Sequence, residues 1–281
     1  ADQLGLLDRL VGAQPSLVRL DAGATEALLP ALRPGYAAGG AVEGGAADID
    51  VAGLHQHHLR RLRAAGAEVR TAAPVLGGER VAGRWRVSLS GGAVEADVVV
   101  DAAGAWADVV ATRFGARPVG LVPKRRTAAI ARSDVPVGAG WPLACDVEDR
   151  FYFKPEGPHV LVSPADETPV EPSDARAEEA DVAVALERVR EATTLGVRSV
   201  VRAWAGLRTF AVDGLPVVGA DPAVAGFWWL AGQGGYGIQM APALADLVAS
   251  LVLGRDAPAS LAGLDVGALG PGRPRGAPPP V

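Results

Sequence analysis

The sequence predicts a mixed fold, α/β with a separate antiparallel part (α+β), on three observations. An apolar strand at 97–100 runs through a turn of small residues into a helix at 107–114, which is the geometry of an α/β ligand-binding crevice. An aromatic strand at 227–230 likewise runs through a glycine-rich turn into an apolar helix from Ala241. Between them, the stretch from 118 to 201 contains mainly short strands and one polar helix, which indicates a second domain.

Apolar spacing and breaker residues define the elements of the first 71 residues. We expect helices at 4–11, 24–32 and 51–65, a glycine-rich loop at 39–45 and a short strand at 68–71. Pro30 and Pro34 should end the second helix, because proline cannot extend the helical hydrogen-bond ladder. Asp50 suits the N-cap of the third helix, and Gly66 suits the position just past its last turn.

Alternating and continuous apolar patterns predict the remaining elements. A strand at 81–89 leads through the turn Gly91-Gly92 into a strand at 93–100. The second strand ends in a continuous apolar run, which is typical of strands buried on both faces of a parallel sheet. Further on we expect strands at 127–132, 150–154 and 159–162, a helix at 178–193, and after Gly206 a loop, the strand at 227–230 and the helix from Ala241.

Composition excludes several classes of protein. The 281 residues are 49% hydrophobic and 21% charged, so a globular core can form. The net charge of −5 argues against a nucleic-acid partner, and no apolar run approaches the ~20 residues of a transmembrane segment. A single cysteine, Cys145, excludes an intrachain disulfide and favours a reducing compartment, which we expect to be the cytoplasm. The Ala-, Gly- and Pro-rich tail at 255–281 is expected to be flexible.

Hydrolase and metal motifs are missing from the sequence. His55 and His58 share a helix face, but no neighbouring ligand motif completes a metal site, and exposed or capping roles suit these histidines better. The sequence has neither a Gly-x-Ser-x-Gly elbow nor a His-Glu-x-x-His motif. Chemistry based on a serine nucleophile or a catalytic metal is therefore unsupported.

Two small-residue turns are the strongest candidates for a ligand site. The segment Gly232-Gln-Gly-Gly-Tyr-Gly237 lies between an aromatic strand and an apolar helix, where glycines allow a flat or anionic ligand to approach the backbone. A tight turn that needs positive φ angles would produce the same pattern. The segment 102–106 after the buried strand offers the same close approach, with simple helix–strand packing as the alternative.

Two arginines in apolar surroundings are candidates for anion binding. Arg126 follows Lys124 and Arg125, and Arg208 closes the segment Trp204-Ala-Gly-Leu-Arg. A buried guanidinium requires an anionic partner, and its planar fork suits a carboxylate. That partner is either a ligand or a carboxylate of the protein itself.

Taken together in order, these and further segments resemble the D-amino acid oxidase-like, FAD-dependent oxidoreductases, and among them D-arginine dehydrogenase-type enzymes of bacteria. The resemblance extends over about residues 20–254. Its segments include 30–35 (PALRPG), 47–50 (ADID), 101–106 (DAAGAW), 123–126 (PKRR), 151–155 (FYFKP), 204–208 (WAGLR) and 234–239 (GGYGIQ).

The resemblance implies a discontinuous, Rossmann-like FAD-binding domain at 1–116 and 202–254 and an antiparallel substrate domain at 117–201. It implies that Arg126, Tyr152 and Arg208 bind the substrate carboxylate and that the backbone of Gly206 accepts a hydrogen bond from the substrate amine. The residues implied to contact FAD are Pro74, Ala103, Gly104, Trp106, Gly232, Gly234, Gly235, Tyr236, Gly237, Ile238 and Gln239.

The implied activity is oxidative deamination of a D-amino acid, with an electron acceptor that the sequence leaves unknown. Oxidation of sarcosine, glycine or proline is the alternative within the family, and a non-catalytic fragment or subunit is the alternative outside it. The chain departs from the family pattern because the first strand with its Gly-x-Gly-x-x-Gly turn is absent from this sequence. From that departure we expect these residues alone to bind FAD weakly or not at all. Asp101 also replaces the family's usual Asn, and Met240 the Thr of close relatives.

Overall fold

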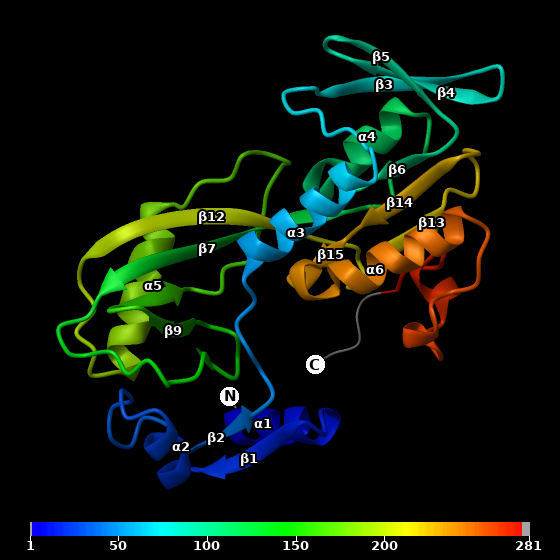
Figure 1. Cartoon of the computed structure of the whole chain (residues 1–281). Helices are drawn as coiled ribbons and strands as arrows, with labels where there is room; N and C mark the ends of the chain where they lie inside the picture. The colour runs from blue at the N-terminus through cyan, green and yellow to red at the C-terminus, as the bar shows by residue number, and fades with distance from the viewer. Residues whose placement is uncertain (1, 277–281) are drawn as a thin grey trace. The chain divides into compact units, whose positions relative to one another are not determined.

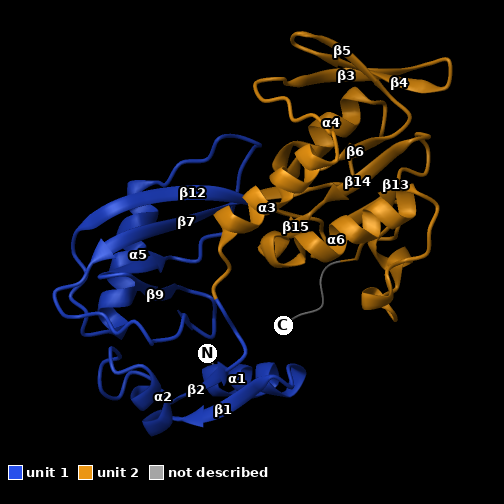
Figure 2. Ribbon diagram, in the orientation of Figure 1, with its two compact units in different colours: residues 1–47, 124–207, 281 blue, residues 48–123, 208–280 orange. Residues whose placement is uncertain are grey.

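The computed structural model describes residues 2–276 and divides into two compact units (Figure 2). Within the described residues, unit 1 comprises 2–47 and 124–207, and unit 2 comprises 48–123 and 208–276. Residues 1–47 therefore group with 124–207, whereas the sequence interpretation joined them to the segment up to 116. The mixture of helices with antiparallel and parallel strand pairs confirms the expected fold class.

The N-terminal part of unit 1 is a two-stranded sheet with two helices. In chain order these elements are α1 (Gln3–Ala13), β1 (Leu17–Asp21), α2 (Ala22–Leu28) and β2 (Gly39–Glu43), with β1 antiparallel to β2. The Asp21 carboxylate caps α2 by accepting from the Ala24 N–H at 2.8 Å. Helix α2 ends at Leu28, four residues earlier than expected, because the residue before Pro30 is disfavoured in helical conformation. The expected loop at 39–45 is partly strand β2.

The rest of unit 1 is an antiparallel sheet packed against one helix (Figure 1). Its strands lie in the order β12 (Val200–Phe210), β7 (Val122–Arg132), β10 (His159–Ser163), β9 (Tyr152–Glu156) and β8 (Ala144–Cys145), and β11 (Thr168–Pro169) also pairs with β7. Helix α5 (Glu179–Ala192) packs on this sheet through Val189 and Ala192, which share a buried core with Phe153, Val160 and Val162. The expected strands and helix are confirmed, with bounds shifted by a few residues.

Unit 2 contains a parallel strand pair covered by helices. Strand β6 (Val99–Asp101) pairs parallel with β14 (Phe227–Ala231), which pairs antiparallel with β13 (Val217–Ala220). A 3₁₀ turn at Gly104–Trp106 and helix α4 (Ala107–Arg113) follow β6, while β15 (Gln233–Gly234) and helix α6 (Gly237–Val252) follow β14. The remaining elements are helix α3 (Val51–Ala64), the meander β3 (Val75–Val81), β4 (Arg84–Leu89) and β5 (Gly92–Ala96), and 3₁₀ turns at Ala259–Leu261 and Val266–Leu269.

An aromatic cluster packs against β14 in unit 2. The ring of Phe114 lies 5.2 Å from that of Trp85 and 5.4 Å from that of Phe227, and Phe227 in turn contacts Trp229 at 5.6 Å. The indole N–H of Trp85 donates to the Gly226 carbonyl at 3.1 Å, so its polar edge is satisfied inside the core. The cluster therefore ties β4 and the end of α4 to β14.

Two of the expected elements are wrong, and a third is confirmed in part. Residues 68–71 form no strand, and the strand of this region begins instead at Val75. The expected strand at 81–89 is confirmed over 84–89 as β4, whereas Val81 ends β3 and the chain turns at Ala82-Gly83, where both residues have positive φ. The expected loop after Gly206 is the end of the long strand β12.

The C-terminal segment up to residue 276 is anchored, in contrast to the flexible tail predicted for 255–281; residues 277–281 lie outside the described residues. Arg273, with a side chain that is 6% exposed, binds both carboxylate oxygens of Asp213 at 2.7 and 2.9 Å. Its guanidinium also donates to the carbonyls of Leu269 and Leu215 at 2.8 and 2.9 Å. These bonds hold the segment against the loop that follows β12.

Removing this anchor should destabilise unit 2. We expect Arg273→Ala to lower the free energy of unfolding by about 3–5 kcal/mol, because Asp213 would keep a largely buried, unpaired charge. Arg273 also lowers the pKa of Asp213 through its hydrogen bonds. The pair's stabilisation is therefore present above pH ~4, the ordinary aspartate range, and is lost as the pH falls through the lowered pKa.

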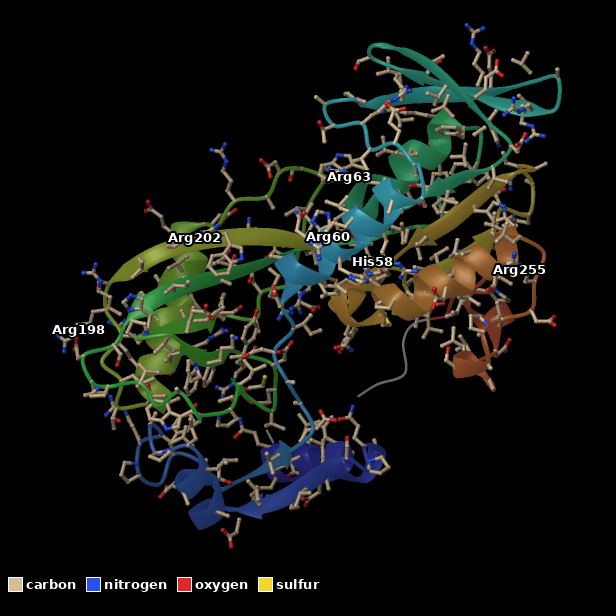
Figure 3. The ribbon with its side chains drawn as sticks, viewed as in Figure 1. His58, Arg60, Arg63, Arg198, Arg202 and Arg255 are labelled. Carbon is tan, nitrogen blue, oxygen red and sulfur yellow. The ribbon has the colours of Figure 1, made fainter. Side chains whose placement is uncertain are left out.

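Denaturation followed by tryptophan fluorescence would measure both effects, with Arg255→Ala as the control. Arg255 is an exposed arginine just beyond the C-terminal end of α6 (Figure 3). Equal midpoints for the two variants would contradict the anchoring role of Arg273.

Candidate active site

The parallel pairing of β6 with β14 brings the two small-residue turns of unit 2 to the same edge of the sheet. Asp101, the last residue of β6, pairs with Trp229, two residues before the end of β14. Parallel strands present their carboxyl ends on one side, where ligands of α/β sheets bind. The turn at 102–106 and the glycine-rich turn at 232–237 therefore follow neighbouring strand ends.

Arg208 lies against the glycine-rich turn. Thr209 pairs with Gly234 and Phe210 with Gln233, which places the end of β12 beside the turn. A Cβ atom on Gly235 would lie only 2.9 Å from Nη1 of Arg208, so the missing side chain leaves the guanidinium room to lie along the backbone. Arg208 is half-buried, and among residues 2–276 no carboxylate pairs with it. Its charge is therefore available to an anionic ligand.

The glycine-rich turn needs its glycines for conformation as well as for space. Gly232 and Gly234 have φ angles of +68° and +56°, which side chains rarely adopt. Helix α6 then begins at Gly237 without a capping side chain, so its first N–H groups and the positive end of its dipole are not satisfied by a protein side chain. Tyr236 is 62% exposed and Ile238 is 47% exposed. The tight turn expected for this motif is therefore confirmed, while its use as a ligand site stays a prediction.

The turn after β6 has an open backbone and a buried acid. Gly104 has φ +57°, and a methyl group in place of its Cα hydrogen would meet nothing within 4 Å, while Trp106 beside it is 44% exposed. Asp101 is 2% exposed; its Oδ1 accepts from the Ala103 N–H at 3.0 Å. Its Oδ2 has no hydrogen-bond partner in the part of the chain that the structure describes. Sequence reasoning noted this residue only as a departure from Asn.

The protonation of Asp101 is shifted toward the neutral acid. Burial raises the pKa of Asp101 to about 7; the hydrogen bond from Ala103 lowers it, and the neighbouring Asp108 raises it further. The Asp108 carboxylate itself accepts from three backbone N–H groups, those of Val119, Gly120 and Leu121, at 2.8–3.0 Å. These three bonds tie the Asp108 side chain to the 119–121 backbone.

Pro74 lies just before β3, where its carbonyl accepts from the Ser90 N–H at 3.3 Å, and its side chain is exposed. The strand whose end it was expected to occupy does not form. Its proposed proximity to a cofactor therefore rests on the resemblance alone.

In unit 1, Arg126 and Tyr152 lie together. The Arg126 guanidinium is 6.0 Å from the Tyr152 ring, and the Arg126 side chain is 7% exposed. Its Nε donates to the Asp166 carbonyl at 2.8 Å, and its Nη2 donates to Glu167 at 3.0 Å. Burial raises the pKa of Glu167, but the hydrogen bonds and charges of Lys124 and Arg126 outweigh it and leave that pKa below its usual value. Arg126 thus has a protein carboxylate as partner, the alternative that the sequence left open.

Gly206 lies in β12, with open space where a Cβ atom would be. Histidines 55, 57 and 58 are exposed on α3, along which Figure 3 also shows Arg60 and Arg63. Within residues 2–276 no group of three or more His, Cys, Asp or Glu side chains could hold a metal ion. The described residues also contain no helix long and apolar enough to cross a membrane.

Sequence comparison finds a matching family and several curated relatives. The profile of the family described as FAD dependent oxidoreductase (DAO) matches residues 1–251. Glycine oxidase of Bacillus licheniformis is 27% identical over 210 residues, which cover 73% of this chain and 54% of that protein. Glycine oxidase of Pseudomonas aeruginosa is 30% identical over 185 residues, covering 64% of this chain and 47% of that protein. The chain thus spans about half the length of the curated relatives that it matches.

Solved structures share the fold. Glycine oxidase from Geobacillus kaustophilus superposes with a TM-score of 0.82 at 23% identity, covering 96% of this chain and 70% of that one. L-proline dehydrogenase from P. horikoshii superposes with a TM-score of 0.78 at 18% identity, covering 91% and 68%. At these identities the likeness establishes the fold alone.

The glycine-rich turn yields a direct test of local geometry. We expect Gly234→Ala to lower the free energy of unfolding by about 1–3 kcal/mol, because an alanine would be strained at φ +56°. Its Cβ would also meet Cε1 of Phe210 at 2.6 Å. Gly91→Ala, at a hairpin turn with open space, is the matched control in unit 2. Thermal denaturation of both variants measures the difference, and equal melting temperatures would contradict the assigned turn conformation.

Proposed function

This chain belongs to the DAO family of FAD-dependent oxidoreductases, and on this basis we propose that it forms part of an enzyme that oxidises the amine of an α-amino acid. The substrate is glycine or a D-amino acid. Oxidation removes a hydride from Cα and a proton from the amine, giving an imine that water converts into a 2-oxo acid and ammonia. Bound FAD supplies the hydride-accepting chemistry, while the protein supplies binding and orientation.

Arg208 is the observation that carries this proposal. Its half-buried guanidinium lacks a carboxylate partner among residues 2–276 and lies along the backbone at Gly235. A guanidinium binds a carboxylate through two parallel hydrogen bonds, which fixes the orientation of the substrate as well as its position. In our proposal Arg208 holds the α-carboxylate, so that the substrate Cα–H bond has one defined direction.

The residues of unit 2 fit FAD. The free N-terminus of α6 offers N–H groups and a positive dipole end to an acceptor-rich ligand. The open backbone at Gly104 admits close approach, and the exposed faces of Trp106, Tyr236 and Ile238 suit a flat ring system. We propose that the segments 103–106 and 232–239 contact the cofactor, with Pro74 as a further contact on the strength of the resemblance.

The substrate-binding residues proposed for unit 1 are Arg126, Tyr152 and Gly206. Arg126 keeps Nη1 without a hydrogen bond among the described residues, since Nε and Nη2 are engaged by Asp166 and Glu167. We therefore expect Arg126 to assist carboxylate binding less than Arg208 does. The Gly206 carbonyl is proposed as the acceptor for the substrate amine.

Two observations favour different substrates. Curated relatives named glycine oxidase favour glycine, whereas the resemblance to D-arginine dehydrogenase-type enzymes favours D-amino acids. Glycine and D-amino acids share a hydrogen at the same position on Cα, so one arrangement of carboxylate and amine contacts serves both. A secondary amine such as sarcosine or proline is the alternative within the family, and a non-catalytic subunit is the alternative outside it.

A substrate screen tests the proposal on the full-length protein loaded with FAD. We expect anaerobic bleaching of the flavin absorbance by glycine, D-alanine or D-arginine, and none by L-alanine. Reaction with sarcosine or L-proline only would replace the proposal with secondary-amine oxidation. FAD binding without bleaching by any amino acid would favour the non-catalytic alternative.

Substitution of Arg208 tests its proposed role. We expect Arg208→Ala to lower kcat/KM by about 10- to 150-fold, since a hydrogen bond to a charged group contributes about 1.5–3 kcal/mol. Arg208→Lys should recover only part of this loss because lysine lacks the planar fork. Steady-state kinetics would measure both variants beside Arg255→Ala, which removes an exposed arginine of the same unit. An unchanged kcat/KM in Arg208→Ala would exclude the carboxylate contact.

A further inference from the structure

Asp101 is a buried carboxyl for which the described residues provide no counter-charge. It closes β6 with 2% of its surface exposed. Of its two oxygens, Oδ1 accepts from the Ala103 N–H, and Oδ2 has no partner among residues 2–276. A buried carboxylate without a cation or a full set of donors is costly, and such groups become neutral instead.

The charged groups around Asp101 strengthen this tendency. Helix α4, which packs on β6, carries Asp108 and Arg113. Asp108 is a neighbouring like charge, although Arg275 of the C-terminal segment interacts with Asp108 in turn. The Arg113 guanidinium is directed to the Val75 carbonyl at 2.5 Å. Strand β14, the paired neighbour, has only uncharged side chains. The 3₁₀ turn at 104–106 adds no charged side chain either.

Protonation of Asp101 removes the buried charge but leaves a buried hydrogen-bond donor without an acceptor. A proton on Oδ2 turns this atom into a hydrogen-bond donor, and the described residues offer it no acceptor. The carboxyl sits at the base of the turn whose open backbone at Gly104 we assign to the cofactor. FAD is rich in acceptor atoms, so bound cofactor can complete the bonding of Oδ2.

We propose that Asp101 is a positioning residue for FAD, acting as a neutral acid whose Oδ1 fixes the 102–104 turn and whose Oδ2–H donates to the bound cofactor. The proposal rests on FAD binding at this turn but not on the identity of the amine substrate. Ionisation of Asp101 removes the donor and places a buried charge beside Asp108. FAD binding should therefore weaken as the pH rises through the pKa of about 7.

The sign of the accompanying stability change follows from the same raised pKa. Because the folded-state pKa of Asp101 lies above the value of an unfolded aspartate, the native protein binds the extra proton between pH ~4 and pH ~7. Stability without FAD should thus decrease as the pH rises across this range. Asp101→Asn stays neutral at every pH and should lose that contribution to the pH dependence.

The test is the dissociation constant of FAD for the full-length apoprotein, measured by flavin fluorescence at pH 6 and pH 8. A requirement for the protonated acid with a pKa near 7 predicts about tenfold weaker binding to the wild type at pH 8. Asp101→Asn retains a donor and should bind FAD with little change between the two values. Asp246→Asn, which alters an exposed carboxylate on α6, should follow the wild type.

The same pH dependence in the wild type and Asp101→Asn would overturn the proposal, as would pH-independent binding to the wild type. If Asp101→Asn does not fold, infrared spectroscopy of the wild type at pH 6 decides. A protonated carboxylic acid band that shifts on isotopic labelling of aspartate and disappears by pH 8 would support the proposal, and its absence would overturn it. Because FAD binding is measured without an amine, failure here is distinguishable from an incorrect substrate assignment.

Discussion

The candidate site of unit 2 depends on one constraint, the parallel pairing of β6 with β14. Parallel strands finish at the same edge, so the register of Asp101 against Trp229 fixes where both following turns begin. Phe114, Phe227 and Trp229 pack together in the core against which Val99 of β6 also lies. A substitution in that core that displaces the strands would therefore shift both turns, although neither turn contains a residue of the aromatic cluster.

Local sequence patterns were sufficient to predict those elements whose apolar spacing, caps and glycines lie within one segment. The strand–turn–helix units around Asp101 and Gly232, the capped helix α3 and the helix α5 were predictable because apolar period, caps and glycines are local properties. Strand β12 was missed in favour of a loop at Gly206, since this long strand is defined by its pairing with β7 and β15. The N-terminal pair β1 and β2 was missed for the same reason, because the two strands pair across the intervening helix α2.

For the site, the sequence indicated which residue types could bind a ligand, but it did not indicate which of them form ion pairs or hydrogen bonds within the protein. Both Arg126 and Arg208 suggested anion binding, yet only the folded chain distinguishes them: Glu167 engages Arg126, while Arg208 lies along Gly235. The raised pKa of Asp101 was equally out of reach, because burial and the approach of Asp108 arise from packing. Substrate choice is decided by groups around the substrate side chain, which no short motif encodes.

The order in which the chain visits its two units has a consequence for its synthesis. The chain contributes residues 1–47 to unit 1, then 48–123 to unit 2, and returns to unit 1 at 124–207 before its last segment. During synthesis, the N-terminal helices and strands of unit 1 therefore cannot pack against the antiparallel sheet until that sheet has been translated. During that interval Leu29 and Ala31 lack the later residues with which they share a buried core. No single cut in the gene separates one unit from the other.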